Sequence, residues 1–320
     1  MEQRRLGRSG LLVSRVGLGT MTWGRDTDEH EAADQLAAFR DAGGTLLDTA
    51  AAYGDGTAEA LIGGLLAHRG DRDEVVLCTK AGIRAVGDGP GVDVSRRALL
   101  ASLDRSLRRL ATDHVDLFLV EAHDAAVPLE ETLSTLDHAV RSGRARYAGV
   151  ANHGGWQLAR VATAASCTAP AGTTPVVVDQ VEYSLLDRTA EAEVLPAARA
   201  TGVGVVGWSP LGRGVLSGKY RTGTPADSRA ASPHLGGFVG CYLHARAGRI
   251  VEAVSTAAQG LEATAVEVAL AWARDAPGMA AVVVGARTAA QLRGSLSAED
   301  LVLPAEIRRA LDDVSAPATP

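Results

Sequence analysis

The sequence SRRALLASLDRSLRRLATDHVDLFLV, residues 95–120, contains the pattern that decides the fold. Ser95 is a suitable N-cap for a helix, and an apolar stripe follows it at helical spacing, formed by Leu100, Leu103, Leu107 and Leu110. The run at 115–120 is apolar without alternation, which is typical of a strand buried on both faces. The stretch therefore predicts a helix followed by a buried strand of a parallel sheet.

The same alternation of a short β-branched run and an amphipathic run extends along the chain. Candidate strands lie at 16–19, 45–48, 75–79, 115–120, 145–150, 176–179, 203–207 and 280–284. Eight strand-then-helix units in one chain favour a closed barrel over an open sheet, and one such barrel takes roughly 250 residues or more. We therefore expect an α/β fold, a single (β/α)8 TIM barrel, as one domain over residues 1–320.

A few segments interrupt this rhythm. Residues 1–15 predict a hairpin that caps the barrel, with its turn at 8–10. Residues 209–247 form a long Gly/Pro/Ser-rich loop after the seventh strand, and loops of this length are usually functional or disordered. Residues 315–320 resemble a frayed tail. A Gly-x-Gly-x-x-Gly match at 202–207 does not predict a dinucleotide-binding loop, because it lies within a strand candidate and does not open a helix.

Composition and charge are those of a globular protein with a large core, since 46% of the residues are hydrophobic and 22% are charged. The net charge of −6 argues against a nucleic-acid partner, and the basic residues at 96–109 are interpreted as a solvated helix face. No apolar run is long enough to span a bilayer, so we expect no membrane partner. The expected partner is a small-molecule substrate.

The cysteines and the N-terminus indicate a cytoplasmic protein. Cys78, Cys167 and Cys241 are odd in number and far apart, which favours reduced thiols over disulfides. The first residues are polar with no apolar run behind them, so no signal peptide is expected. The histidines show no metal-ligand spacing, so the sequence predicts no metal site.

Polar side chains gather at the predicted carboxyl ends of the strands, where barrel enzymes carry their chemistry. The first group is Asp48, Tyr53 and Lys80. A free tyrosine, with a pKa of about 10, is a poor acid at neutral pH, and a nearby ammonium lowers that pKa. A buried lysine in turn needs a carboxylate to stay charged. The three residues form either a general acid or a structural Asp–Lys pair beside an unrelated surface tyrosine.

Several stretches resemble one known family. Residues 48–54, DTAAAYG, with Thr79-Lys80 at the next strand end, are similar to the signature of the aldo-keto reductases, in particular of bacterial members related to the potassium-channel β subunits. The likeness extends over nearly the whole chain, through 5–11, 17–21, 180–186, 208–220 and 284–288 with Gln291. The resemblance implies NADPH, bound in an extended form across the mouth of the barrel.

The resemblance also assigns roles to residues. Tyr53 would be the proton donor, Lys80 would tune its pKa, and Asp48 would pair with Lys80. Trp208 would stack on the nicotinamide, and Arg287 would bind the adenosine 2′-phosphate, which favours NADP over NAD because a guanidinium suits a phosphate dianion. The other cofactor contacts would come from Gly19, Thr20, Asn152, Gln180, Ser209, Leu211, Gly212, Arg213, Gly285, Gln291 and Ser295.

On the substrate side, the resemblance implies that Trp23 and His123 line the pocket, although Trp23 could instead be a packing tryptophan at the barrel rim. Two positions depart slightly from the family pattern. Ala151 stands where a serine commonly precedes the asparagine, and Ser295 stands where an asparagine commonly contacts the adenine. Both differences predict looser cofactor binding without its loss.

Glu121 is a larger departure, because the family usually has a histidine at this strand end and here a histidine, His123, comes two residues later. Three explanations remain open. Glu121 could act as a neutral carboxylic acid that donates a hydrogen bond to a carbonyl oxygen. The strand end could bulge so that His123 supplies the imidazole. The site could also bind cofactor without turnover.

The expected function is hydride transfer from NADPH to a polarised double bond of a small organic substrate. Reduction of C=O is the default, and reduction of a conjugated C=C is a variant because steroid double-bond reductases of this family carry glutamate at the position of Glu121. Imine reduction also stays open. Two other functions compete with this one, a Schiff-base lyase that uses Lys80 and an NADP(H)-sensing subunit with little turnover. The family suggests a monomer or a weak homo-oligomer.

Overall fold

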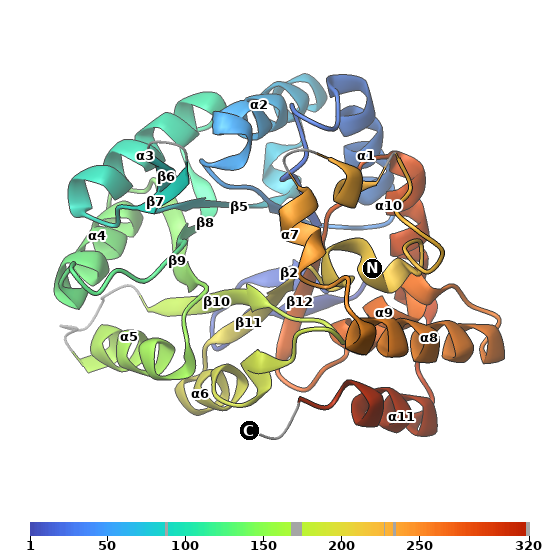
Figure 1. The fold of residues 1–320 in the computed structure, drawn as a ribbon. Helices are drawn as coiled ribbons and strands as arrows, with labels where there is room; N and C mark the ends of the chain where they lie inside the picture. Colours follow the sequence, from blue (N-terminus) through green and yellow to red (C-terminus); the bar gives the residue numbers. More distant parts are fainter. Residues whose placement is uncertain (87–88, 168–174, 227, 233–234, 318–320) are drawn as a thin grey trace.

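The computed structural model describes the chain except for residues 87–88, 168–174, 227, 233–234 and 318–320. Within the described residues, eight parallel strands close into a barrel with helices around it (Figure 1), which confirms the predicted (β/α)8 fold. The strands follow one another in chain order around the barrel, and β12 pairs with β3 to close it. They are β3 (Val16–Gly19), β4 (Leu46–Asp48), β5 (Val76–Ala81), β8 (Val115–Val120), β9 (Ala145–Ala151), β10 (Val176–Glu182), β11 (Gly204–Trp208) and β12 (Met279–Val284).

Helices cover the outside of the barrel (Figure 1). In α3 (Arg96–Arg109) the side chain of Ser95 accepts a hydrogen bond from the backbone N–H of Ala98, as expected of an N-cap. Its buried face includes Leu99, whereas the predicted Leu100 is only partly buried. The other long helices are α1 (Glu29–Asp41), α2 (Thr57–Arg69), α4 (Leu129–Arg141), α5 (Gly155–Cys167), α6 (Val194–Thr201), α8 (Ala245–Gly260), α9 (Ala265–Arg274), α10 (Ala289–Leu296) and α11 (Ala305–Ser315).

The strands are buried on both faces, which explains their continuous apolar sequences. In β8, Leu117 and Leu119 belong to an apolar cluster inside the barrel, whereas Phe118 and Val120 belong to the larger cluster that packs against the helices. This alternation follows from the two-residue period of a strand. β4 and β5 divide in the same way, since Leu46 and Cys78 belong to the interior cluster whereas Leu47 and Leu77 belong to the outer one.

The N-terminal hairpin closes the amino end of the barrel, as predicted for residues 1–15. Strands β1 (Gln3–Arg5) and β2 (Leu12–Ser14) pair antiparallel, and the fully buried Leu6 and Val13 join the interior cluster. Gly7 makes this closure possible, because its φ is +57° and a Cβ there would lie 2.5 Å from the backbone nitrogen of Gly204.

The predicted loop 209–247 contains local structure. It is built of the 3-10 turns η4 (Gly212–Ser217) and η5 (Arg229–Ala231) and the short helix α7 (Gly236–Gly240). Its predicted end is three residues too late, because α8 begins at Ala245. The sequence prediction also missed a second hairpin after β5, formed by β6 (Ile83–Val86) and β7 (Gly89–Val92).

Several smaller predictions can be compared with the structure. Gly202 ends α6 and the next residues form β11, so the Gly-x-Gly-x-x-Gly match is not a dinucleotide-binding loop. Helix α11 includes Ser315, so the tail begins later than predicted. Cys78 and Cys241 are free thiols, and the side chain of Cys167 lies outside the described part. None of the described helices is long and apolar enough to cross a membrane.

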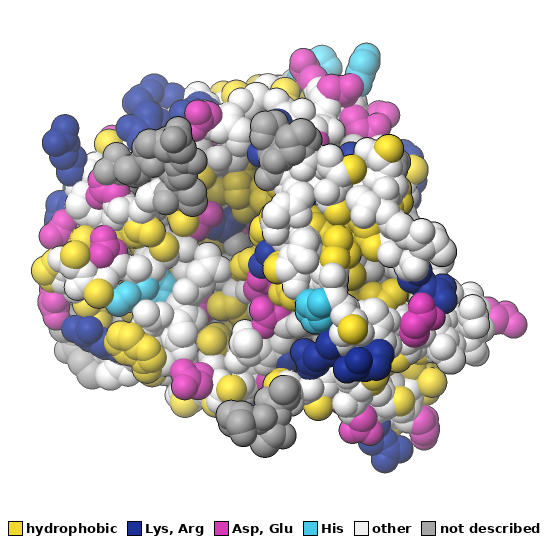
Figure 2. All heavy atoms as spheres, viewed as in Figure 1, with side chains coloured by type: hydrophobic (Ala, Val, Ile, Leu, Met, Phe, Trp, Pro, Cys, Tyr) yellow, Lys and Arg dark blue, Asp and Glu magenta, His cyan; other side chains and the backbone are white. Residues whose placement is uncertain are grey.

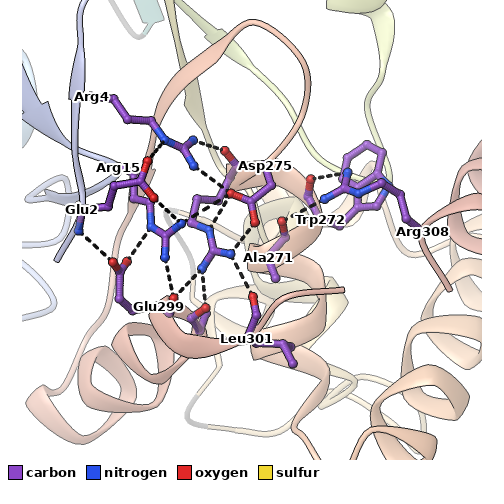
Figure 3. A network of polar contacts seen from close by, with 11 residues as sticks. Glu2, Arg4, Arg15, Ala271, Trp272, Asp275, Glu299, Leu301 and Arg308 are labelled. Carbon is purple, nitrogen blue, oxygen red and sulfur yellow. Dashed lines mark hydrogen bonds and ion pairs between the residues drawn. The ribbon is translucent and has the colours of Figure 1, made fainter. Parts of the chain in front are cut away.

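A network of ion pairs, here called the amino-end network, joins the hairpin to the C-terminal part of the barrel (Figure 3). Its centre is Arg274, at the end of α9, which is fully buried. The Arg274 guanidinium donates to both carboxylate oxygens of Asp275 and to the carbonyl oxygens of Ala298 and Leu301, the last at 2.9 Å.

The hairpin side of the amino-end network is formed by Arg4 and Arg15 (Figure 3). Arg4 donates to Asp275 at 2.9 Å, and Arg15 donates to Glu2 at 2.8 Å and to Glu299 at 2.9 Å. The contacts of Arg4 with Asp275 and of Arg15 with Glu299 join residues 271 and 284 positions apart in sequence, so no local pattern could have predicted them. Because charged groups in a buried place need partners, the network fixes how the hairpin sits on the barrel.

Candidate active site

The candidate active site lies at the carboxyl ends of the strands, two residues after the last side chains of the interior cluster. Because the strand period is two residues, the residue two positions after an interior side chain also points into the barrel. This rule places four polar or aromatic groups around one opening, at Asp48, Lys80, Glu121 and Gln180, and Trp208 continues the series on β11. They line a cavity of about 540 Å³, here called the central cavity. Figure 2 shows a face of the molecule that is hollowed near its centre and bordered by hydrophobic side chains.

The predicted group of Asp48, Tyr53 and Lys80 is brought together by the fold. Lys80 Nζ donates to Asp48 Oδ2 at 2.8 Å and to the Thr49 carbonyl oxygen at 2.9 Å, and it lies 3.5 Å from the Tyr53 hydroxyl. Lys80 is 2% exposed and Asp48 is 3% exposed. Tyr53 is therefore not an unrelated surface residue, because its hydroxyl contacts the buried ion pair directly.

The pKa values of this group follow from burial and pairing. Burial disfavours the Lys80 ammonium, but Asp48, together with Tyr53, Cys78 and Glu121, outweighs this effect and holds the pKa of Lys80 above its ordinary value. Burial also raises the pKa of Tyr53 well above its ordinary value, and the attraction of Lys80 only partly opposes this. Lys80 thus acts on the Tyr53 pKa in the predicted direction, but in the protein alone desolvation outweighs the ammonium and the net shift is upward. Tyr53 is protonated at neutral pH.

Glu121 lies on the interior face, beside this group. Its backbone N–H donates to the Ala81 carbonyl oxygen at 2.8 Å, which continues the regular β5–β8 pairing. Its Oε2 atom is buried and has no hydrogen-bond partner among the described residues. Burial raises the pKa of Glu121, Lys80 opposes this and Asp48 adds to it, so the neutral acid is more accessible than for an exposed glutamate.

His123 does not replace Glu121. The register of β8 with its neighbours has no bulge, and His123 lines a separate cavity of about 330 Å³, here called the outer cavity, between the barrel and helices α4 and α5. The prediction that His123 lines the substrate pocket is wrong for the central cavity, and so is the explanation in which a bulge brings the imidazole into the site. An unbroken ladder carries Glu121 inward and leaves His123 outside.

Two amides and an indole define one end of the central cavity. Trp208 Nε1 donates to Asn152 Oδ1 at 2.9 Å, and Asn152 Nδ2 donates to the Glu121 carbonyl oxygen at 3.0 Å. Asn152 has a φ of 58°, a conformation that asparagine tolerates better than most residues. Gln180 Nε2 donates to Asp48 Oδ1 at 2.8 Å, so it also supports the Asp48–Lys80 pair.

Most of the predicted cofactor residues line the central cavity, namely Gly19, Asn152, Gln180, Trp208, Ser209, Leu211, Gly285, Arg287, Gln291 and Ser295. Two others do not. Thr20 is buried and its hydroxyl donates to the Asp48 carbonyl oxygen at 3.0 Å, so it supports the floor of the site. Gly212 is also buried, and a Cβ there would lie 2.6 Å from Leu186 Cδ1.

Arg213, the third predicted cofactor residue outside the cavity, is engaged within the protein. Its guanidinium donates to both carboxylate oxygens of Glu182, at 2.9 and 2.6 Å, and lies 3.9 Å from the ring centroid of Phe238. Phe238 lies in α7 and lines the central cavity. Arg213 therefore holds α7 over the cavity, and the structure gives it no direct place in the lining.

Trp23 is also placed differently from the prediction that it lines the substrate pocket. The side chain is fully buried in the outer apolar cluster, and its Nε1 donates to Gln35 Oε1 at 3.1 Å. The polar indole edge therefore finds its partner on α1 and turns the ring away from the cavity. Trp23 is a packing tryptophan, which was the alternative interpretation of this residue.

The sequence prediction missed two cationic residues of the central cavity, Lys219 and Arg229. With Arg287 they bring three cations together in the lining of the cavity. Burial, together with Arg229 and Arg287, lowers the pKa of Lys219, although Tyr220 opposes this. Burial and Arg287 likewise lower the pKa of Arg229. Lys219 lies in a stretch that matches the family, so that match could have indicated it, whereas Arg229 carries no local signal.

A buried carboxylate supports β5, the strand that carries Lys80. Glu59, in α2, is fully buried, and its Oε1 accepts a hydrogen bond of 2.7 Å from the hydroxyl of Thr79, next to Lys80. Its Oε2 accepts from Arg109 at 3.2 Å. Arg109 packs against Gly56 in the turn after Tyr53, where a Cβ would lie 2.2 Å from the guanidinium carbon. Arg109 thus pairs with a buried group, which corrects its interpretation as part of a solvated face.

Comparison with known proteins agrees with this geometry. The model of the Aldo/keto reductase family matches residues 15–316. The chain belongs to this family. It is 39% identical to the uncharacterized oxidoreductase YrpG of Bacillus subtilis (strain 168), over 98% of this chain and 96% of that protein. A family assignment over nearly the whole chain makes this protein an oxidoreductase.

Two plant members of the aldo/keto reductase family are also similar. The protein of Oryza sativa subsp. japonica named "Probable voltage-gated potassium channel subunit beta" is 34% identical over 94% of this chain and 92% of its own length. The protein of the same name from Arabidopsis thaliana is 33% identical over the same shares. Among the described residues of this chain, no cluster of three or more His, Cys, Asp or Glu side chains is arranged to hold a metal ion.

Proposed function

We propose that this oxidoreductase uses NADPH to reduce a polarised double bond of a small organic substrate. The observation that carries the proposal is the contact of the Tyr53 hydroxyl with the buried Asp48–Lys80 pair at the floor of the central cavity. This arrangement supplies a protonated acid at a site that excludes most water. Reduction of an aldehyde or ketone is the default reaction.

The lining of the central cavity fits a nicotinamide dinucleotide with a phosphate-rich end. Lys219, Arg229 and Arg287 all line the cavity; Arg229 and Arg287 lower the pKa of Lys219, and Arg287 lowers the pKa of Arg229. An anionic group would relieve this repulsion, and guanidinium groups suit a phosphate. Elsewhere in the lining, Trp208 offers an aromatic face beside the amide of Asn152. Three cations favour the additional phosphate of NADPH over NADH.

NADPH bound in this cavity would supply the hydride. Tyr53 then donates its proton to the substrate oxygen as negative charge develops there. The Lys80 ammonium, 3.5 Å from the hydroxyl, stabilises the phenolate that forms. Asp48 keeps Lys80 charged, and Gln180 holds Asp48 in place. Each group therefore acts on the reacting oxygen through Tyr53.

Glu121 extends the range of substrates that we propose. In its neutral form it can donate a hydrogen bond to the same substrate oxygen as Tyr53, because its side chain reaches the same cavity. Two acids on one oxygen polarise a conjugated enone strongly, so hydride can also add to the β-carbon to give an enol. Conjugated C=C reduction is therefore part of the proposal, with Glu121 as the second acid.

The experiment that tests the proposal has two stages on one sample. NADPH and NADH are first titrated against the protein, with tryptophan fluorescence as the readout. Oxidation of the reduced cofactor is then followed at saturating concentration with aldehydes, ketones and conjugated enones. Tight NADPH binding with turnover supports the proposal. If neither cofactor binds, the proposed use of NADPH is wrong, although the family assignment is not affected.

A second candidate function is an NADP(H)-binding sensor subunit with little turnover. The observation that favours it is the similarity to two proteins named as probable channel β subunits. NADPH binding without turnover on the whole substrate panel would support it over the reductase. The Schiff-base lyase is disfavoured, because the raised pKa of Lys80 keeps it an ammonium, which is not a nucleophile. Borohydride trapping with substrate would detect such a lyase.

We further propose that the protein works in the cytoplasm as a monomer or weak homo-oligomer, with a small molecule as its only partner. The free thiols Cys78 and Cys241 support a reducing compartment. Sedimentation at several protein concentrations would measure the oligomeric state, and a stable tetramer would contradict this part of the proposal.

A further inference from the structure

The outer cavity and the central cavity lie on opposite faces of the ends of β8 and β9. Alternate residues of a strand point to opposite faces, and the end of β8 follows this rule: Glu121 lines the central cavity, whereas Val120 and Ala122 line the outer cavity. Directly after β9, Asn152 lines the central cavity and His153 the outer cavity. The barrel wall therefore separates the two, and they share no lining residue.

His153 presents an unused hydrogen-bond acceptor to the outer cavity. The residue is 4% exposed, and its Nδ1 lies 3.0 Å from the Ala151 carbonyl oxygen. A carbonyl oxygen can only accept, so Nδ1 carries the proton and Nε2 keeps a lone pair. Burial lowers the pKa of His153, which favours this neutral form. The hydrogen bond of the ring to a described residue is made by Nδ1, so a hydroxyl in the cavity could donate to the Nε2 lone pair.

Aromatic rings form one side of the same cavity. The ring of His123 lies edge to face with His153, at 5.8 Å between centroids, and with Trp156, at 5.7 Å. Trp156 is 60% exposed, which is unusual for so large a hydrophobic side chain. The opposite wall contains the buried Val94 and Val161. Rings and valines together suit a flat apolar ligand.

The charges around the outer cavity give no preference for a charged ligand. Asp124, Glu130 and Arg160 line it, so both signs are present. The Asp124 carboxylate accepts a hydrogen bond of 2.8 Å from the backbone N–H of Ala126, which commits it to the local turn. An uncharged ligand with one hydroxyl donor matches this lining best.

We propose that the outer cavity is a second binding site, for a small uncharged aromatic alcohol or phenol whose ring packs against His123 and Trp156 and whose hydroxyl donates to Nε2 of His153. The volume of about 330 Å³ accommodates a molecule of one or two rings. An occupant would influence the central cavity without competing for it, because Asn152, next to His153, bonds to both Trp208 and the Glu121 carbonyl oxygen.

The test uses 2-naphthol as the probe and 2-methoxynaphthalene as its match, because the ether keeps the rings but has no hydroxyl donor. Binding to the full-length protein is measured by ligand-observed NMR, with and without saturating NADPH. We expect one molecule of 2-naphthol per chain, bound about tenfold more tightly than the ether, as one hydrogen bond would give. NADPH should not displace it. Displacement by NADPH, equal affinities or an absence of binding would overturn the proposal.

Three variants locate the contacts. His153→Phe keeps a ring but removes the acceptor, so the affinity for 2-naphthol should fall to that of the ether. Trp156→Ala, at an exposed position that does not threaten folding, should weaken both ligands. Arg160→Gln removes a positive charge from the lining, and because the proposed ligand is uncharged, it should change neither affinity. If Arg160→Gln weakens 2-naphthol, the bound species is the anion and the proposed uncharged ligand is wrong. The readout is binding, so failure here leaves the proposed reductase untouched.

Discussion

At the amino end of the barrel, Arg274 is fully buried and every side of its guanidinium meets an oxygen, from Asp275, Ala298 or Leu301. At the carboxyl end, Glu121 Oε2 is buried without any described partner. Both places bury charged side-chain types, but only the amino-end network gives each of its buried groups a partner. An unsatisfied buried polar atom costs about 1–3 kcal/mol, so the central cavity gives up stability that the amino-end network retains.

This difference separates a structural end from a chemical end. The amino-end network holds groups that never need to change their bonds. The central cavity keeps Glu121, Tyr53 and Asn152 positioned by neighbours, while leaving hydrogen-bonding capacity for a ligand. Removing a side chain should therefore reduce activity at one end and stability at the other.

The largest expected effect comes from removing the Tyr53 hydroxyl from the central cavity. Tyr53→Phe removes the proposed acid and should lower turnover about 1,000-fold, because a positioned general acid contributes about 100- to 10,000-fold. Affinity for NADPH, measured by fluorescence titration, should not change. Thermal stability should also stay close to that of the wild type. Turnover of the variant at wild-type rates would remove Tyr53 from the mechanism.

The second prediction concerns the loss of a donor from the amino-end network. Arg274→Met leaves Asp275 and two carbonyl groups without their buried donor, and should lower the free energy of unfolding by about 3 kcal/mol, as expected when one member of a buried pair is lost. Urea denaturation measures this change. The matched control is Arg221→Met, since Arg221 pairs with Glu252 at an exposed site, and its denaturation midpoint should stay unchanged. Equal midpoints for both variants would contradict the assigned role of the network.

The third prediction concerns Glu59, which has fully paired carboxylate oxygens like the amino-end network but supports the strand that carries Lys80. Glu59→Gln removes the charge that holds Arg109 while keeping the contact with Thr79. We expect kcat to fall about tenfold because Tyr53 and Lys80 lose their alignment, as small misplacements cost large factors in rate. The affinity for NADPH should remain. A loss of stability with unchanged kcat would show that Glu59 is only structural.

The smallest expected effect concerns pH. Burial raises the pKa of Glu121 above its ordinary value of 4.5, so the folded protein holds a proton that the unfolded chain releases as pH rises. The wild type should lose stability as pH rises from about 4.5 through the folded pKa, and Glu121→Gln should remove this loss. The difference in melting temperature between variant and wild type should therefore grow in favour of the variant over that range. A constant difference would mean that Glu121 is not perturbed.

The fold was readable from the sequence because its signals are local. Each barrel strand is a short run that is apolar on both faces, and all eight predicted runs appear in the barrel. The hairpin β6–β7 was missed because its sequence has no clear alternation of apolar and polar residues. The candidate site was predicted largely from family resemblance, and Asp48, Lys80 and Glu121 do converge.

What the sequence could not provide depends on contacts between distant residues. The turn of Trp23 away from the cavity is set by Gln35, and the direction of the Tyr53 pKa is set by how completely the fold excludes water. Arg213 was expected in the cavity, but Glu182 and Phe238 hold it elsewhere. Such outcomes follow from three-dimensional packing, which no spacing along the chain encodes.

The closure of the barrel has a consequence for the chain as it is synthesised. β3 lies near residue 16, but one of its edges pairs only with β12, which begins at Met279. Arg15, just before β3, likewise donates to Glu299, far along the chain. During translation the first barrel strand therefore keeps an open edge until β12 has left the ribosome. An unpaired strand edge invites wrong pairing. We expect chains truncated before residue 279 to aggregate or to need chaperones, whereas chains that include β12 can close the barrel.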